Sequence, residues 1–192
     1  MNNISSESKL KDFIYVFDNI LSHESCDLIL KEYEKADWKD SLVGNNELNP
    51  DIRNCKVINI SSEDNIKENL EIRKLIDNTI FDAVGNIINK ISNELKNITI
   101  REDSGYSLLK YTKDGFYEEH VDTDSVINNR RFSCSLCIND DYEGGEFSFF
   151  NDEIKYNIKK GSVIVFPSNH LYPHQILPIT KGIRYSIITW LR

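Results

Sequence analysis

Residues 183–191 of the chain read Ile183-Arg184-Tyr185-Ser186-Ile187-Ile188-Thr189-Trp190-Leu191. The β-branched and aromatic residues of this stretch follow a Gly-containing turn and predict a strand. Because successive side chains of a strand point to opposite faces, one face is mainly apolar and the other carries Arg184, Ser186 and Trp190. An Arg that faces the interior needs an anion, since a buried unpaired guanidinium is costly. Either a structural Asp or Glu, or a dicarboxylate ligand gripped bidentately, would supply that anion.

Upstream of this strand, the period of two continues back to about residue 100. It predicts further strands over residues 104–111, 131–138, 146–150 and 162–166. Turn residues separate these strands, among them Asp114-Gly115, Gly144-Gly145 and Lys160-Gly161. The second half of the chain is therefore expected to be built from short strands. An opening strand is also predicted near the N-terminus, over residues 12–17.

In the first half of the chain, apolar residues recur with the period of a helix. Ser22 is the expected N-cap of one helix. Its buried stripe is predicted to be Cys26, Ile29, Leu30 and Tyr33. A second helix is predicted from about residue 65 to residue 96, with an apolar face formed by Ile72, Ile76, Ile80, Ala83, Val84, Ile87, Ile88, Ile91 and Leu95. Residues 38–55 show no sustained period and predict loop and short strand.

This order of elements, helices first and short strands afterwards, is typical of an α+β fold in which helices pack on a sandwich or barrel. No linker separates the two halves. We therefore expect one domain over residues 1–192, with a helical support layer in residues 1–100 and a barrel core in residues 101–192. A length of 192 residues is enough to bury a sizeable core.

Composition and charge mainly exclude functions. The chain has 23 Lys and Arg against 31 Asp and Glu, a formal charge of −8, which argues against nucleic-acid binding through clustered cations. No apolar run approaches the roughly 20 residues of a membrane-spanning helix. We see no secretory signal, and the thiols are too few and too irregularly spaced for a disulfide framework or a zinc site; they are Cys26, Cys55, Cys134 and Cys137. We expect a cytoplasmic protein with free thiols.

The residues with the clearest chemical potential are the few histidines. His120-Val121-Asp122 places an imidazole and a carboxylate two residues apart, so on an extended segment both point to the same side and could share a metal ion. Asp124 is a rival carboxylate, although it lies farther from His120. A third ligand could come from either His170 or His174. Two His and one carboxylate form the facial triad of non-haem Fe(II) oxygenases, which leaves coordination positions open.

Taken together and in order, several short motifs extend this pattern over much of the chain. They are Tyr111, Tyr117, His120 and Asp122; the strand that begins at Arg131-Phe132; Asn139-Asp140 and Gly144-Gly145-Glu146; Gly161 and Phe166-Pro167-Ser168; and His174, Pro178, Thr180, Gly182, Arg184-Tyr185-Ser186 and Trp190. Residues 106–191 thereby resemble the catalytic core of the iron(II)/2-oxoglutarate-dependent oxygenases, specifically the prolyl 4-hydroxylase-like group. Residues 13–38 also resemble that group. The resemblance implies a double-stranded β-helix, a jelly-roll or cupin-like barrel, with supporting N-terminal helices.

The resemblance also implies roles for individual residues. His120, Asp122 and His174 would ligate iron, and His174 is preferred to His170 because it fits the spacing to Arg184. Arg184 would bind the distal carboxylate of 2-oxoglutarate, where many collagen-type relatives are expected to use Lys. Matching positions give further expected roles: Tyr111 would hydrogen-bond the same carboxylate, Ser186 would assist the cosubstrate, and Tyr117 and Trp190 would either wall the iron pocket or serve as core packing.

The activity implied by the resemblance is hydroxylation that consumes 2-oxoglutarate and O₂ and needs Fe(II), with ascorbate as an expected assistant. A carboxylate ligand, Asp122, favours hydroxylation over halogenation. The expected substrate is a prolyl residue in a peptide or protein, or a similar amino-acid side chain. A free amino acid or other small molecule, and a non-catalytic metal-binding β-barrel module, remain alternatives. Loops are expected to set specificity, here residues 40–55 and 122–130, in which Arg53 and Arg130 either contact substrate or are solvated.

Overall fold

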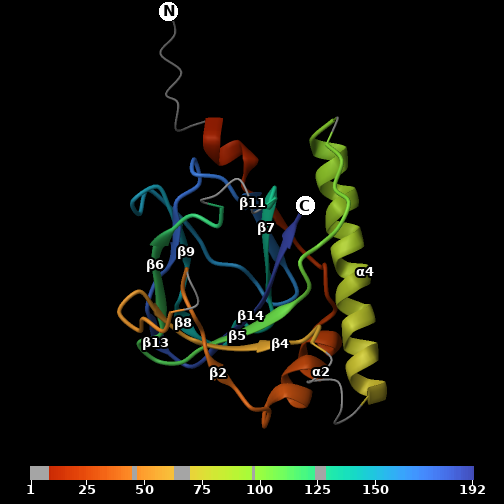
Figure 1. Ribbon diagram of the computed structural model, residues 1–192, viewed down its shortest axis with the longest axis vertical. Coiled ribbons are helices and arrows are strands. Elements are labelled where there is room, and N and C mark those ends of the chain that lie inside the picture. The colour runs from red at the N-terminus through yellow and green to blue at the C-terminus, as the bar shows by residue number, and fades with distance from the viewer. Residues whose placement is uncertain (1–8, 45–46, 63–69, 97, 124–128) are drawn as a thin grey trace, which may run out of the picture.

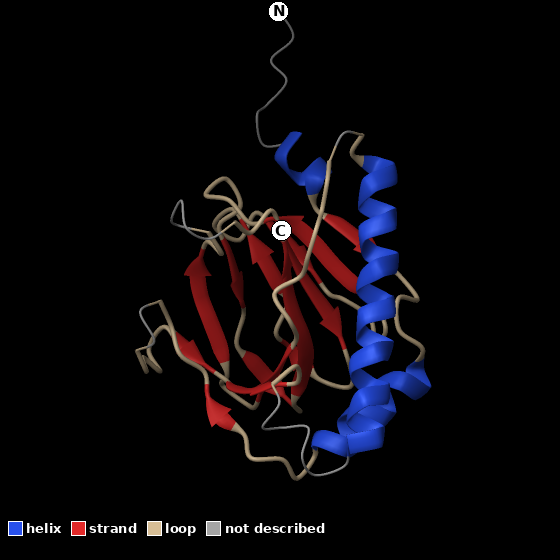
Figure 2. Ribbon diagram, turned by 45° about the vertical axis from the view of Figure 1, so that its right-hand side comes forward, coloured by secondary structure: helices blue, strands red, loops and turns tan. Residues whose placement is uncertain are grey.

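The computed structural model describes residues 9–44, 47–62, 70–96, 98–123 and 129–192. In this part of the chain, two antiparallel sheets face each other, and the helices gather on one side of the strands (Figures 1 and 2). The arrangement is the jelly-roll core predicted from the resemblance. Across the described residues the two sheets do not join into a closed barrel, because each ends in short edge strands.

The larger sheet has seven strands within the described residues, and its central strand is the one predicted over residues 183–191. In spatial order they are β1 (Tyr15–Phe17), β11 (Val163–Pro167), β7 (Phe132–Cys137), β14 (Arg184–Leu191), β5 (Ser107–Tyr111), β4 (Lys56–Asn59) and β2 (Lys39–Asp40). β14 lies between β7 and β5 and pairs with both, so its residues are covered on each side.

The smaller sheet has five strands in the same part of the chain. Its order is β10 (Ile154–Tyr156), β9 (Phe147–Phe149), β12 (His174–Ile176), β6 (Phe116–His120) and β3 (Arg53–Asn54). A separate pair is formed by β8 (Glu143–Gly144) and β13 (Ile179–Lys181). The chain passes from the smaller to the larger sheet between β3 and β4, at the buried residue Cys55.

Two α-helices cover the outer face of the larger sheet. α2 (His23–Tyr33) begins after Ser22, whose hydroxyl accepts a hydrogen bond from the Ser25 amide at 3.1 Å, so the predicted N-cap is confirmed. α4 (Leu70–Glu94) stands along the side of the sheet (Figure 2). Every residue of its predicted apolar face belongs to, or packs against, the core between helices and sheet.

Two separate cores result from the alternation of side chains along β7, all of whose residues are buried. Cys134 points into the core under the helices, whereas Cys137 points into the core between the sheets. This opposite placement follows from the period of two along a strand and rules out a shared metal for the two thiols. The core between the sheets is the one that opens to a cavity.

Some predicted boundaries were wrong. Residues 12–17 do not form one strand, because a 3₁₀ turn, η1 (Lys11–Phe13), closes through the Ile14 amide and the Lys11 carbonyl before β1 begins. The predicted strand 104–111 starts only at Ser107. The prediction of loop and short strand for residues 38–55 is confirmed, since they contain β2 and β3. The start of the second helix, before Leu70, lies outside the described residues. Among the helices that are described, none is both long and apolar enough to cross a bilayer.

Candidate functional site

His120 and His174 are brought together by strand pairing. His120 is the last residue of β6, and His174, the first residue of β12, lies directly opposite it in the antiparallel register. The register then shifts before Ile176, which marks an irregularity beside the site. The two imidazole rings have centroids 4.3 Å apart. His120 and His174 have 53 residues between them in the sequence, and they lie side by side because two neighbouring strands pair.

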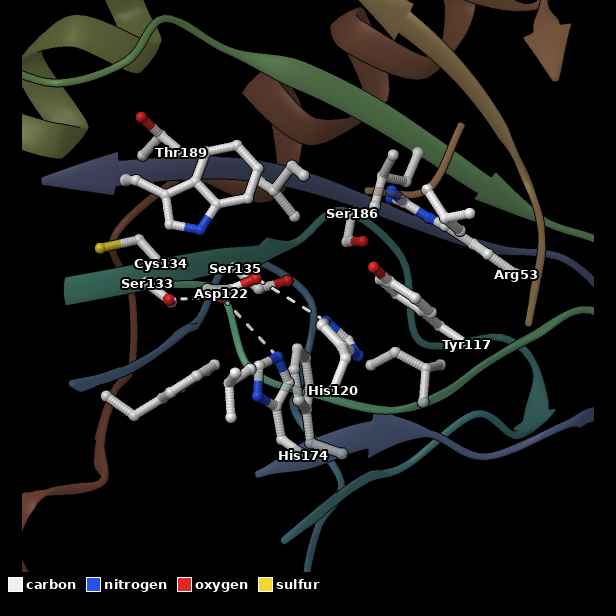
Figure 3. A pocket seen from close by; sticks show the side chains of 18 of the residues that line it. Arg53, Tyr117, His120, Asp122, Ser133, Cys134, Ser135, His174, Ser186 and Thr189 are labelled. Carbon is white, nitrogen blue, oxygen red and sulfur yellow. Dashed lines mark hydrogen bonds and ion pairs between the residues drawn. The ribbon is translucent and has the colours of Figure 1, made fainter. Parts of the chain in front are cut away.

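Asp122 completes the cluster from just beyond the end of β6. Its Oδ1 lies 3.7 Å from His120 Nε2, and its Oδ2 lies 3.7 Å from His174 Nε2 (Figure 3). The three side chains offer ligand atoms that all lie within 4.8 Å of one another. The sequence argument placed His120 and Asp122 on one extended segment. In the structure the strand has ended at His120, and the chain bends at Asp122 while still turning its carboxylate toward the histidines.

The hydrogen bonds of the two rings fix which nitrogen faces the cluster. His120 Nδ1 lies 2.8 Å from the Glu118 carbonyl, and His174 Nδ1 lies 3.1 Å from the Tyr172 carbonyl. A carbonyl oxygen can only accept, so each Nδ1 carries the proton and donates. Each Nε2 then presents its lone pair toward Asp122. This is the tautomer that binds a metal, and a backbone carbonyl on the other nitrogen is the usual support for such a ligand.

The charge state of the cluster also suits a divalent cation. Burial, and next the neighbouring His174, lower the pKa of His120 to about 3, which leaves the ring neutral. Burial by itself raises the pKa of Asp122, but His174, His120 and the hydroxyl of Ser133 outweigh it, and the net pKa is lowered. Neutral imidazoles and an ionised carboxylate are the forms that bind metal. The residues present therefore fit an iron site.

Aromatic rings and a hydroxyl hold the three groups in place. Tyr117 stacks on His120 with ring centroids 3.6 Å apart, and Phe166 meets His174 edge-on at 4.6 Å. The hydroxyl of Ser133, on β7 of the facing sheet, donates to the Asp122 carboxylate and also contacts Ser168. The site therefore bridges the two sheets, and its orientation depends on their packing.

Arg184 lies in the same cavity and has no acidic partner among the described residues. It is 3% exposed, and its Nη1 donates to Ser186 Oγ at 3.0 Å, while its Nε has no hydrogen-bond partner. Tyr111 is its partner in the register of β5 and β14, and the guanidinium carbon lies 5.4 Å from the centre of that ring. A buried guanidinium without a carboxylate is costly, so the arrangement fits an anionic ligand. The sequence left two possible anions for Arg184, a structural Asp or Glu and a dicarboxylate ligand. The described residues supply no Asp or Glu in that position.

Tyr142 and Gly145, which the sequence analysis did not assign to the site, lie behind Arg184. Gly145 has a φ of +70°, and a Cβ added to it would lie 3.0 Å from Cδ of Arg184 and 3.4 Å from Cε2 of the Tyr142 ring. Burial raises the pKa of the Tyr142 phenol to about 12, so it stays protonated beside the guanidinium. The paired glycines were predicted to make only a turn. Tyr142 is an aromatic residue in an otherwise polar turn, and this could have indicated that the turn is partly buried. Periodicity, however, cannot show that a turn packs against a distant strand.

A cavity of about 580 Å³ contains all of these groups. Tyr117, Ser186 and Arg53 line it (Figure 3). Trp190 and Arg130 also contribute to its wall. Arg130 lies over Trp190, with the guanidinium carbon 3.7 Å from the ring centre. The rival ligands do not enter: His170 is exposed in a turn outside the cavity, and Asp124 lies outside the described residues.

Comparison with known proteins finds relatives of the segment that carries this site. The family model of the 2OG-Fe(II) oxygenase superfamily matches residues 106–192, the segment that carries the three candidate ligands and Arg184. The matched segment is somewhat less than half of the chain, and it is similar to that superfamily. Proteins of that superfamily use Fe(II), 2-oxoglutarate and O₂, and the described residues of this chain include a candidate His-Asp-His iron site.

The relatives of the oxygenase domain are hydroxylases. A PKHD-type hydroxylase of Prochlorococcus marinus (strain MIT 9301) is 25% identical over 187 residues, which cover 92% of this chain and 77% of that protein. A PKHD-type hydroxylase of Idiomarina loihiensis is 32% identical over 92 residues, which cover 45% of this chain but only 41% of that protein. The stronger identity is thus confined to part of the chain.

Solved structures share the fold of the oxygenase over nearly its full length. A prolyl hydroxylase from Trichoplax adhaerens, solved with a hypoxia-inducible factor peptide fragment, has a TM-score of 0.78 at 18% identity and covers 98% of this chain and 87% of its own. The viral collagen prolyl hydroxylase of Paramecium bursaria Chlorella virus 1, solved with 2-oxoglutarate, has a TM-score of 0.69 at 19% identity, with coverages of 94% and 96%.

Proposed function

We propose that this protein hydroxylates a prolyl residue in a peptide or protein, or a similar amino-acid side chain, with Fe(II), 2-oxoglutarate and O₂. The observation that carries the proposal is the position of Arg184 in the same cavity as the His120–Asp122–His174 cluster. A protein that only held a metal would not need a buried cation without an acidic partner. The names of its hydroxylase relatives favour the same activity.

In this proposal each residue has a limited physical task. His120, Asp122 and His174 would hold the iron, and the iron would supply the activation of O₂ that side chains cannot. Arg184, Ser186 and Tyr111 would bind the distal carboxylate of 2-oxoglutarate and so fix the cosubstrate in one orientation. Ser133 and the backbone carbonyls of Glu118 and Tyr172 would keep the ligands aimed at the metal. Tyr117 and Trp190 would limit the room beside it.

The test measures turnover and product together. Purified protein with Fe(II), ascorbate, 2-oxoglutarate and a library of proline-containing peptides is expected to form succinate, and mass spectrometry is expected to find one added oxygen atom in a peptide. His174→Ala should abolish both signals because it removes a metal ligand. His170→Ala is the matched control, since His170 is exposed and outside the cavity, and it should keep full activity. Equal succinate from the wild type and His174→Ala would remove the support for this function.

A second candidate keeps the cofactors but takes a free amino acid or another small molecule. The same assay separates it from the first, because succinate would then rise with free amino acids and not with any peptide. A non-catalytic metal-binding module is the third reading, and it predicts metal binding without succinate under every condition. We further propose that residues 1–192 act as a single domain in the cytoplasm.

A further inference from the structure

Arg53 is a second cation of the cavity wall that the proposed reaction leaves unused. It lies on β3, the edge strand of the smaller sheet, and its guanidinium carbon is 4.5 Å from the centre of the Tyr117 ring. Tyr117 in turn stacks on His120. One aromatic ring therefore separates the Arg53 guanidinium from a candidate iron ligand, which places it beside the space where a substrate would be oxidised (Figure 3).

The contacts of Arg53 leave its positive charge without an anion. Its Nη1 donates to the Leu42 carbonyl at 3.3 Å, and its Nε is buried with no hydrogen-bond partner. None of the ion pairs among the described residues includes Arg53. A guanidinium in this position keeps its charge. The Leu42 carbonyl, the Tyr117 ring and the Cys55 side chain contact it, but none of them is a carboxylate, so the partly buried charge is poorly compensated.

The charges in the cavity, counted with Fe(II) and 2-oxoglutarate bound, also indicate an excess of positive charge. Arg184 and Arg53 bring two positive charges, and Fe(II) brings two more, whereas Asp122 and 2-oxoglutarate together bring three negative charges. One positive charge remains, although the protein as a whole carries −8. Arg130, the other guanidinium of the wall, has partners of its own. Its contacts with the Asp122 carbonyl and the Trp190 ring do not remove its charge, so the cavity with iron and 2-oxoglutarate bound is net positive. Arg53 is a cation of its wall that forms no ion pair with a described residue.

The position of Arg53 at the rim separates it from the cosubstrate. Arg184 is held at the floor of the cavity by Ser186, on the larger sheet, whereas Arg53 reaches across from the smaller sheet to the carbonyl of Leu42. Leu42, which is 45% exposed, and Val43 line the cavity together with Arg53. Apolar side chains around a cation form a surface that suits a ligand with an apolar body and one negative group.

We propose that Arg53 binds a carboxylate of the substrate close to the carbon that is hydroxylated. This inference rests on the proposed function and specifies its substrate class. The carboxylate has two possible sources, the α-carboxylate of a free amino acid or the side chain of an acidic residue next to the target in a peptide. Both present the same group to the guanidinium, and a bidentate contact would use the Nε that has no partner.

The test measures binding without turnover. The full chain, loaded with Mn(II) and 2-oxoglutarate, is titrated in a calorimeter with two matched pairs of probes: L-proline against L-prolinamide, and an end-blocked aspartyl-proline peptide against its asparaginyl counterpart. In one pair, the carboxylate probe should bind roughly tenfold more tightly than its neutral partner. The pair that shows the preference identifies the source of the carboxylate.

Variants assign the preference to Arg53. Arg53→Gln should remove it, Arg53→Lys should restore part of it, and Lys56→Gln, an exposed cation on the next strand, should leave it intact. The proposal is overturned if neither carboxylate probe is preferred, if the preference survives in Arg53→Gln, or if Arg53→Gln weakens only the binding of 2-oxoglutarate. Because Mn(II) permits binding without reaction, these outcomes are distinct from an absence of succinate, which would count against the proposed function itself.

Discussion

At the scale of single residues, Arg184 shows how burial turns a common side chain into a binding group. The guanidinium has Ser186 and the faces of Tyr111 and Phe147 around it, but no acidic group among the described residues. Such a charge is stable only if a ligand compensates it or if water reaches it through the cavity. In the proposed function, Arg184 would gain most of its partners from a bound dicarboxylate.

Replacement of Arg184 tests this role directly. Arg184→Ala is expected to raise the concentration of 2-oxoglutarate needed for half-maximal succinate formation by roughly 100-fold, because a charge-assisted pair of hydrogen bonds is lost. Arg184→Lys keeps the charge and should lose much less. Calorimetric titration with Mn(II) should give the wild-type affinity in both variants. An unchanged requirement for 2-oxoglutarate in Arg184→Ala would exclude Arg184 from the cosubstrate site.

At the scale of elements, the turn after β8 determines where Arg184 can lie. Gly145 has a φ of +70°, a conformation that side chains rarely adopt. A Cβ at this position would also meet the end of the Ile179 side chain and lie 3.0 Å from Cδ of Arg184. The sequence marked the glycine pair as a turn. That the turn abuts a strand nearly 40 residues later follows only from the pairing of β8 with β13.

A pair of glycine variants separates this effect from helix propensity. Gly145→Ala is expected to lower the free energy of unfolding by about 1–2 kcal/mol and to weaken 2-oxoglutarate binding, because it strains the backbone and displaces Arg184. Gly85→Ala, in α4, meets nothing within 4 Å and should instead stabilise the protein by about 0.5–1 kcal/mol without an effect on binding. Urea unfolding and calorimetry measure the two quantities. If Gly145→Ala bound 2-oxoglutarate normally, the turn would have no part in positioning Arg184.

At the scale of the whole molecule, ligand binding should couple to stability because the site spans both sheets. His120 and His174 come from the smaller sheet, whereas Ser133 and Arg184 come from the larger one. A metal and a dicarboxylate that bind only the folded state stabilise it by about 2.7 kcal/mol at 100 times the dissociation constant. For a chain of this size, that corresponds to a rise in the melting temperature of roughly 5–10 °C.

Thermal unfolding with and without ligands checks this coupling. Mn(II) together with 2-oxoglutarate should raise the melting temperature of the wild type and of His170→Ala, and a chelator should reverse the rise. His174→Ala should show little response, since one of its metal ligands is missing. A full response in His174→Ala would mean that the stabilising metal binds elsewhere in the protein.

The features that can be read from the sequence alone are those that depend on residues close together in the chain. The period of 3.6 in residues 70–94, the Ser22 cap and the alternation in residues 183–191 depend on near neighbours, and each was predicted correctly. The pattern His120-x-Asp122 and the fixed spacing from His174 to Arg184 likewise pointed to one metal and one anion. These features can be predicted because a few adjacent side chains and backbone geometry decide them.

Only the tertiary structure decided which distant groups share the cavity. The register of β12 against β6 sets His174 opposite His120, and the register of β14 against β5 sets Arg184 opposite Tyr111. The short strand at Arg53 and the turn at Tyr142 join the site through pairings between segments far apart in the chain. No local period carries that information, because strand register depends on the packing of both sheets at once.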